Sequence, residues 1–218
     1  MQAYYAQRAK EYERIYDKPE RQADLARLRA AIPALFEGEA VLEIACGTGY
    51  WTPLIAARAK SVLAVDYAAE TLELARGKVY ERDNVAFEQA DAYHLPAWPE
   101  RFSACYAGFW WSHIPLEKID SFLAGLHARL APGARVAFMD NRYVEGSSTP
   151  LARRDAAGNT YQERGLADGS RHEVLKNFPT EADLEARLGG IGTEVRVILY
   201  QYYWLATCRI MAGRRRNP

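Results

Sequence analysis

Three acidic residues stand at the ends of three short apolar runs in the first half of the chain. Glu43 lies at the end of the first run, Asp66 ends the second, and Asp91 follows the third. Carboxylates at the ends of buried parallel strands can accept hydrogen bonds from a ligand lying across those ends, such as the hydroxyl groups of a ribose. Taken singly, each acid could instead cap a helix or stabilise a turn. Together, at these spacings, they favour a site for a nucleoside-like ligand.

The loop after the first run, Ala45-Cys-Gly-Thr-Gly49, is rich in small residues. Gly47 and Gly49 lack the Cβ that would keep a ligand away from the backbone. The helix-compatible segment 50–59 follows, so free backbone N–H groups would face the ligand at the positive end of a helix. A dinucleotide fingerprint requires a third glycine, and Thr52 stands in its place. The loop therefore predicts a nucleotide-like ligand, and an NAD(P)-dependent oxidoreductase is the weaker interpretation.

The segment from Glu43 to Gly49 resembles motif I of the class I S-adenosylmethionine-dependent methyltransferases, which usually reads [D/E]-x-G-x-G-x-G. Ala45 replaces the first glycine of that motif, and alanine adopts a positive φ less readily. The resemblance is close over residues 40–140 and holds in pattern only over 180–210. It implies S-adenosylmethionine as cofactor and S-adenosylhomocysteine as product. The residues expected to contact this cofactor are Glu43, Ala45, Gly47, Gly49, Asp66, Tyr67, Asp91 and Ala92.

Methyl transfer to an oxygen, nitrogen or sulfur nucleophile is the activity that the resemblance implies. The N-P-P-[Y/F] motif of enzymes that methylate base and amide amino groups is absent, and Gly108-Phe-Trp-Trp-Ser stands where it would be. The many aromatic residues suit a small, partly apolar acceptor, although they are equally compatible with core packing. A protein that binds the cofactor without turnover is a second alternative.

Two residues are candidates for catalysis. A general base is needed only if the acceptor carries a proton at the working pH. His113 has an ordinary pKa that suits proton removal near neutrality, although a histidine that merely packs at a helix start is an equal alternative. Asp140 ends the fifth apolar run and could bind or orient a polar acceptor. The residues expected near the acceptor are Tyr5, Tyr12, Trp110, Arg142 and His172.

Alternating apolar runs and helical patterns predict an α/β fold with a doubly wound, mostly parallel, seven-stranded sheet and helices on both faces. The last two runs have little sequence between them and predict an antiparallel pair, which the usual dehydrogenase fold lacks. The predicted strands are 40–45, 61–66, 84–90, 102–109, 135–140, 194–200 and 202–210, and the predicted helices between them include 50–59, 68–79, one from Pro115 and 180–188.

Two regions lie outside this alternation. The spacing of tyrosines and apolar residues in segment 1–38 predicts tyrosine-rich and amphipathic helices that cap the site. Residues 141–179 form a long insertion after the fifth strand, and long insertions in α/β enzymes are usually functional. We expect this insertion to act as a lid with substrate contacts, and a surface excursion without a catalytic role is the alternative. We expect all 218 residues to form a single domain.

Composition limits the partners. Lys+Arg and Asp+Glu both total 28, so there is no general electrostatic drive toward nucleic acid or anionic membranes. The three cysteines, Cys46, Cys105 and Cys208, lack C-x-x-C spacing and predict buried thiols in a reducing compartment, with no metal site. The expectation is a cytoplasmic monomer or homodimer that acts on a small-molecule acceptor, without nucleic acid or membrane partners.

Overall fold

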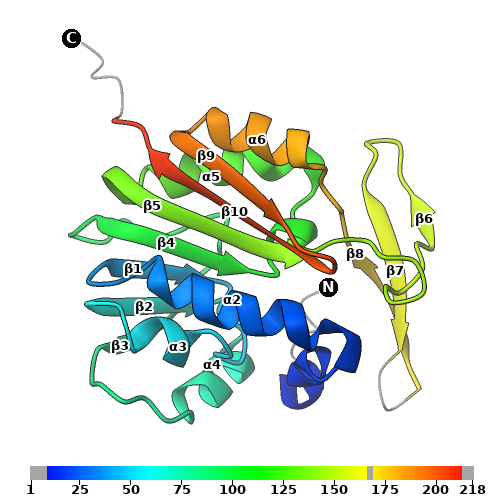
Figure 1. Cartoon of the computed structure of the whole chain (residues 1–218), viewed down its shortest axis with the longest axis horizontal. Helices are drawn as coiled ribbons and strands as arrows, with labels where there is room; N and C mark the ends of the chain where they lie inside the picture. The colour runs from blue at the N-terminus through cyan, green and yellow to red at the C-terminus, as the bar shows by residue number, and fades with distance from the viewer. Residues whose placement is uncertain (1–8, 166–168, 213–218) are drawn as a thin grey trace.

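A seven-stranded sheet forms the centre of the molecule, and its strand order is β3-β2-β1-β4-β5-β10-β9 (Figure 1). The computed structural model describes residues 9–165 and 169–212, with side chains from residue 13 onward. Strands β1 to β5 are parallel, and β10 runs antiparallel to both β5 and β9. The predicted sheet and its antiparallel pair are confirmed. The bounds are β1 (Ala40–Ile44), β2 (Ser61–Asp66), β3 (Val85–Gln89), β4 (Phe102–Gly108), β5 (Leu130–Asn141), β9 (Gly192–Leu199) and β10 (Tyr203–Ile210).

Helices cover both faces of this sheet. Leu25, Leu28 and Ile55 join one buried apolar cluster, which packs α2 and α3 on one face. Phe122 and Leu184 join the other cluster, which packs α5 and α6 on the opposite face. No helix in the described ranges is long and apolar enough to cross a bilayer. The helices are α2 (Gln22–Ala34), α3 (Thr52–Ala56), α4 (Ala69–Arg76), α5 (Ile119–His127) and α6 (Glu181–Gly189), with 3-10 segments η1 (Ala9–Tyr16), η2 (Pro19–Arg21), η3 (Trp111–His113) and η4 (Leu116–Lys118).

The strand order reverses direction at β1, which pairs with β2 on one side and with β4 on the other. In an open parallel sheet, the connections leave such a point toward opposite faces and open a crevice at the carboxyl ends of the strands. The ends of β1, β2, β3 and β4 carry the residues predicted to bind the ligand. The topology therefore brings them to one edge of the sheet.

The insertion 141–179 contains a second, antiparallel sheet of strands β6 (Arg153–Arg154), β7 (Thr160–Gly165) and β8 (Arg171–Leu175). This sheet stands beside the carboxyl ends of the central strands (Figure 1). Hydrogen bonds tie its base to the segment that follows β4. The backbone N–H of Asn177 donates to the carbonyl of Ser112 at 2.8 Å, and the amide of Asn159 accepts from the N–H of Leu116 at 2.8 Å. These hydrogen bonds hold the base of the insertion against the segment after β4.

The N-terminal region divides into two parts with different positions. Glu13 of η1 accepts a hydrogen bond from the Thr48 hydroxyl at 2.8 Å and pairs with Lys78 at 2.7 Å, so η1 reaches the loop after β1. Helix α2 instead buries Leu25 and Leu28 completely against the sheet. Only the first part lies over the crevice, and α2 belongs to the core layer. The tyrosine-rich helix expected at the start of residues 1–38 is a 3-10 segment over its described residues, Ala9–Tyr16.

Candidate active site

The loop after β1 has three successive left-handed backbone positions, with φ of +52° at Ala45, +57° at Gly47 and +75° at Gly49. A Cβ added to Gly47 would meet open space, whereas one added to Gly49 would lie 2.8 Å from the Cβ of Ala75. Gly47 therefore exposes the loop backbone to a ligand. Gly49 also lets the loop pack directly on α4. Ala45 holds the same conformation at a cost that glycine avoids.

Asp66, at the end of β2, fixes this loop. Its Oδ2 accepts a hydrogen bond from the N–H of Gly47 at 2.8 Å. Its Oδ1 accepts from the N–H of Ala68 at 2.9 Å and from the Thr71 hydroxyl at 3.0 Å. Burial raises the pKa of this carboxyl, and these hydrogen bonds oppose the rise. The side chain thus joins the end of β2, the loop after β1 and the start of α4.

A cavity of about 360 Å³ opens over this loop, and we call it the Gly-loop cavity. Six of the eight predicted cofactor contacts line it, since Glu43 and Gly49 lie outside. Its aromatic members follow the ends of β2, β3 and β4. The lining includes Ala45, Gly47, Asp66, Tyr67, Asp91, Ala92, Tyr93, Phe109, Trp110 and His113.

Glu43 lies in a smaller adjoining notch of about 30 Å³, which shares Ala45, Gly47 and Phe109 with the Gly-loop cavity. The side chain is only 2% exposed, and its Oε2 has no hydrogen-bond partner among the described residues. Burial raises the pKa of Glu43 to about 8, against an opposing contribution from Thr52. A buried carboxyl of this kind suits a ligand group that is positively charged and donates hydrogen bonds.

Asp91 lies at the rim of the Gly-loop cavity. Its Oδ1 accepts from the N–H of Tyr93 at 2.9 Å, and its Oδ2 lies 2.9 Å from Nδ1 of His94. Partial burial opposes ionisation of this acid, but the two hydrogen bonds prevail and lower its pKa. An ionised acceptor is therefore available beside Ala92 at the rim.

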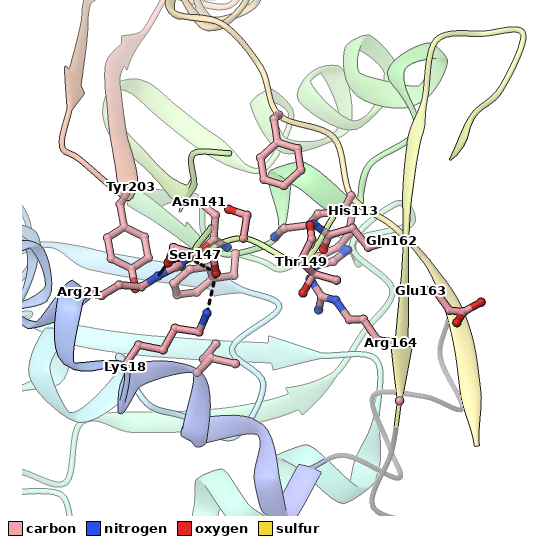
Figure 2. A pocket seen from close by; sticks show the side chains of 16 residues that line it. Lys18, Arg21, His113, Asn141, Ser147, Thr149, Gln162, Glu163, Arg164 and Tyr203 are labelled. Atoms are coloured by element: carbon pink, nitrogen blue, oxygen red, sulfur yellow. Dashed lines mark hydrogen bonds between the residues drawn. The ribbon is translucent and has the colours of Figure 1, made fainter. Parts of the chain in front are cut away.

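A second cavity of about 380 Å³ lies between the insertion, the N-terminal segment and the start of β10 (Figure 2), and we call it the basic cavity. Lys18, Arg21, Arg164 and Lys176 supply its positive charges, and Tyr203 is part of its aromatic side. Phe109 and His113 line both large cavities, so the two meet at these residues. Phe109 has a φ of +57°, a conformation that is rare for a bulky residue and is often found at functional sites.

His113 is held between the two sheets. Its Nδ1 donates to the carbonyl of Leu175 at 2.7 Å, which fixes the ring and leaves the lone pair on Nε2. Burial, followed by the charge of Lys176, lowers the pKa of His113 to about 3. The imidazole is therefore neutral near pH 7.

Asp140 is fully buried and forms an ion pair with Lys176 at 2.9 Å. Its Oδ2 also accepts from the N–H of Ser112 at 3.0 Å and from the Ser112 hydroxyl at 2.7 Å. Its Oδ1 accepts from the N–H of Asn141 at 2.7 Å. This carboxylate does not line either large cavity. Its geometry favours positioning Lys176 over direct contact with an acceptor.

The predicted acceptor contacts fall in different places. Trp110 lines the Gly-loop cavity. Arg142 and His172 are absent from the lining of both cavities. Arg142 donates to the carbonyl of Tyr200, and His172 lies 2.9 Å from the hydroxyl of Ser170. Tyr5 and the side chain of Tyr12 lie outside the described part of the structure.

Comparison with known proteins identifies the family. Residues 41–133 match a family described as a methyltransferase domain. A solved DhpI–SAH complex is 30% identical, with a TM-score of 0.74 and coverage of 96% of this chain and 94% of that chain. A DhpI–SAM–HEP complex is also 30% identical, with a TM-score of 0.75 and coverage of 95% and 94%. The chain is a class I S-adenosylmethionine-dependent methyltransferase by family.

Several curated relatives in this family match the chain over about half of their own length. Demethylmenaquinone methyltransferase from Clavibacter sepedonicus is 31% identical over 132 residues, which cover 60% of this methyltransferase and 50% of the relative. 2-Phytyl-1,4-naphtoquinone methyltransferase from Thermosynechococcus vestitus is 29% identical over 115 residues, or 51% and 50% of the two chains. The chain spans about half the length of these curated relatives.

The sequence of this methyltransferase did not reveal its basic cavity. Lys18 and Arg21 lie in a segment with no recognisable motif, and Arg164 and Lys176 were visible only as charges within a long insertion. Phe109 stands beside Trp110 in an aromatic run, and nothing in the sequence shows its left-handed backbone. Tertiary placement alone brings these residues together.

Proposed function

We propose that this chain transfers the methyl group of S-adenosylmethionine, bound in the Gly-loop cavity, to a small molecule bound in the basic cavity. The observation that carries the proposal is the junction of the two cavities at Phe109 and His113. A methyl donor and a nucleophile in adjoining cavities can be held in line, and such positioning contributes roughly 7–11 kcal/mol in the best cases. The family relationship favours this reaction over the oxidoreductase alternative.

The residues around the Gly-loop cavity fit S-adenosylmethionine. The partnerless Oε2 of Glu43 suits the ammonium group of the methionine part. Asp66 suits the ribose hydroxyls, while Tyr67 and Asp91 at the rim suit the adenine ring. When bound, this cofactor supplies a methyl group already activated by a positively charged sulfur. The protein's own residues then orient the acceptor and exclude water.

We propose that His113 orients the acceptor and does not serve as a strong general base. An imidazole with a pKa of about 3 accepts a hydrogen bond at Nε2 but does not retain a proton near neutrality. His113→Asn, which can still accept a hydrogen bond, should retain more of kcat than His113→Ala. A sigmoidal loss of activity between pH 7 and pH 6 that disappears in both variants would contradict this role.

Two measurements test the proposed function. Calorimetric titration with S-adenosylhomocysteine should give saturable binding, and Asp66→Ala should weaken it. A screen with radiolabelled S-adenosylmethionine over small phenols, amines, thiols, carboxylates and phosphorylated compounds should then yield a labelled product. No binding would refute the cofactor site. Binding without any labelled product would favour the non-catalytic alternative.

A further inference from the structure

The positive charges of the basic cavity are not matched by carboxylates. Within the described ranges, Lys18, Arg21 and Arg164 form no ion pair, whereas Lys176 is paired with Asp140. Lys18 donates to the carbonyl of Ser147 at 2.7 Å. Arg21 donates to the amide of Asn141 at 3.0 Å, and Arg164 donates to that of Gln162 at 2.8 Å. These partners are neutral, so they orient the three cations without compensating their charge.

The nearby acids are engaged elsewhere. Glu163, on the cavity wall, points away from the interior in Figure 2 and pairs with Arg171 at 2.7 Å. Asp24 accepts from the N–H of Tyr202 at 2.8 Å. Glu20 accepts from the hydroxyl of the half-buried Ser147 at 2.8 Å, and its charge acts on Lys18 and Arg21 without a direct ion pair. Within the described ranges, no carboxylate therefore pairs directly with any of the three cations around this cavity.

Burial makes this arrangement costly without a ligand. Arg21 is only 6% exposed, and Nε of Arg164 is a buried atom without a hydrogen-bond partner. Desolvation, with repulsion from Arg21 and Arg164, lowers the pKa of Lys18. Lys176 also feels the charges of Arg164 and Arg21, although Asp140 offsets them in part. Buried cations usually have an anionic partner, and here a ligand can supply it.

The three cations come from separate segments and converge on the same space. Figure 2 shows Lys18 and Arg21 on one side of the cavity and Arg164, with His113, on the other. Guanidinium groups bind the oxygens of phosphoryl and carboxyl groups in a bidentate manner, and an ammonium adds a point charge. Three cations without a directly paired carboxylate suit a dianion better than a monoanion.

We propose that the methyl acceptor is a small organic oxyanion whose charged group binds among Lys18, Arg21 and Arg164. The proposal rests on the proposed function, because it assigns the substrate class of the same site. A phosphoryl group is favoured over a carboxyl group by the charge count. Phe109 and His113 line both cavities, so the acceptor atom would reach the methyl donor there.

Charge complementarity also predicts an asymmetry between the two forms of the cofactor. The sulfonium of S-adenosylmethionine is positive, and the cations across the junction oppose its binding until an anion occupies the basic cavity. S-adenosylhomocysteine has a neutral sulfur and lacks this repulsion. An anion should therefore strengthen binding of S-adenosylmethionine more than that of S-adenosylhomocysteine, and by thermodynamic linkage the reverse also holds.

Calorimetric titration of the S-adenosylhomocysteine complex with inorganic phosphate, and separately with acetate, tests the site. The wild type should bind phosphate saturably and more tightly than acetate. Arg164→Gln and Lys18→Gln should each weaken phosphate binding by about tenfold. The matched control is Arg171→Gln, which removes an exposed cation from the same small sheet outside the cavity, and it should bind phosphate like the wild type.

The outcomes separate the two proposals. Absent or non-saturable binding of both anions, or equal weakening in Arg164→Gln and Arg171→Gln, would overturn the oxyanion site. Tighter binding of acetate would replace phosphoryl with carboxyl as the favoured group. Labelled product from neutral acceptors only would also overturn the site while leaving methyl transfer intact. Failure to bind S-adenosylhomocysteine would instead refute the cofactor cavity, and phosphate binding to the free protein can be measured independently of it.

Discussion

The two cavities are built in opposite ways. The Gly-loop cavity takes its predicted contacts from one continuous stretch, residues 45–92, where each of three strand ends supplies two of them. The basic cavity takes its lining from the N-terminal segment, the ends of β4 and β5, the insertion and the start of β10. The first depends on local loop and strand geometry. The second exists only when distant segments pack together.

This contrast extends to electrostatics. On the cofactor side, the acids Glu43, Asp66 and Asp91 stand ready for hydroxyl, amino and ammonium groups. Around the basic cavity, Lys18, Arg21 and Arg164 carry charge without a directly paired carboxylate. Under the proposed function, acids surround the methyl donor and cations surround the acceptor, so the two ligands would be distinguished by charge.

The largest expected effect is on the acceptor side, through the ion pair of Asp140 with Lys176. Asp140→Ala leaves a buried ammonium without its counterion and should lower the free energy of unfolding by about 3–5 kcal/mol. Urea denaturation measures this loss. Glu163→Ala breaks an exposed pair of the same insertion and should cost less than about 1 kcal/mol. Equal losses in both variants would show that the buried pair has no special structural role.

The cofactor side should respond to Asp66→Ala with a selective loss of affinity. The variant loses a buried acceptor that also fixes the Gly47 backbone, so S-adenosylhomocysteine binding should weaken by about 1.5–3 kcal/mol. Phosphate binding, measured by the same calorimetry, should stay within a factor of about two because Asp66 does not line the basic cavity. A parallel loss of both affinities would show that the two cavities are not independent.

The ionisation of Glu43 gives a pH-dependent test of whether the notch binds the ammonium group of the ligand. Its pKa of about 8 means that the free protein holds a proton there at pH 7, and a ligand ammonium should displace it. Affinity for S-adenosylhomocysteine should therefore rise with pH up to about 8, by at most tenfold per unit, with a proton released to the buffer. Calorimetry in buffers of different ionisation enthalpy measures the release, and Glu43→Gln should abolish it.

The ionisation of Glu43 should also affect the free energy of unfolding of the free protein. This free energy should fall as pH rises, whereas the affinity for S-adenosylhomocysteine should rise. Because the folded pKa is raised, the contribution of protonated Glu43 is full below its unfolded value of 4.5 and is lost as pH rises through about 8. Glu43→Gln should remove this decline in thermal unfolding curves. An unchanged decline would assign it to another group.

The smallest expected effect concerns backbone strain at Ala45 in the loop after β1. Ala45→Gly relieves a left-handed backbone, which costs alanine about 1–2 kcal/mol, but adds about 0.5–1 kcal/mol of unfolded-chain entropy. A net gain of about 0.5 kcal/mol in unfolding free energy is expected, with little change in cofactor affinity. Ala45→Val is the control and should destabilise. A gain with valine would contradict the strain at this position.

Sequence patterns predicted the fold and the cofactor side because both depend on short-range order. The acids at strand ends and the run from Ala45 to Gly49 are positioned by the sheet itself, so spacing is enough to place them. The role of Gly49 was less predictable, because its contact with Ala75 arises from packing of α4. The basic cavity was not predictable, because Arg21 and Arg164 are 143 positions apart in sequence, as their numbers show, and meet only after folding.

The small sheet of the insertion gives the enzyme a place where acceptor preference can be changed. Along β7, Gln162 and Arg164 share the face toward the basic cavity, while Glu163 between them points outward. The backbone pairing of β7 with β8 does not depend on these side chains. Under the proposed function, substitutions at positions 162 and 164 should therefore change which acceptor charge the enzyme prefers. The residues that line the Gly-loop cavity would stay the same.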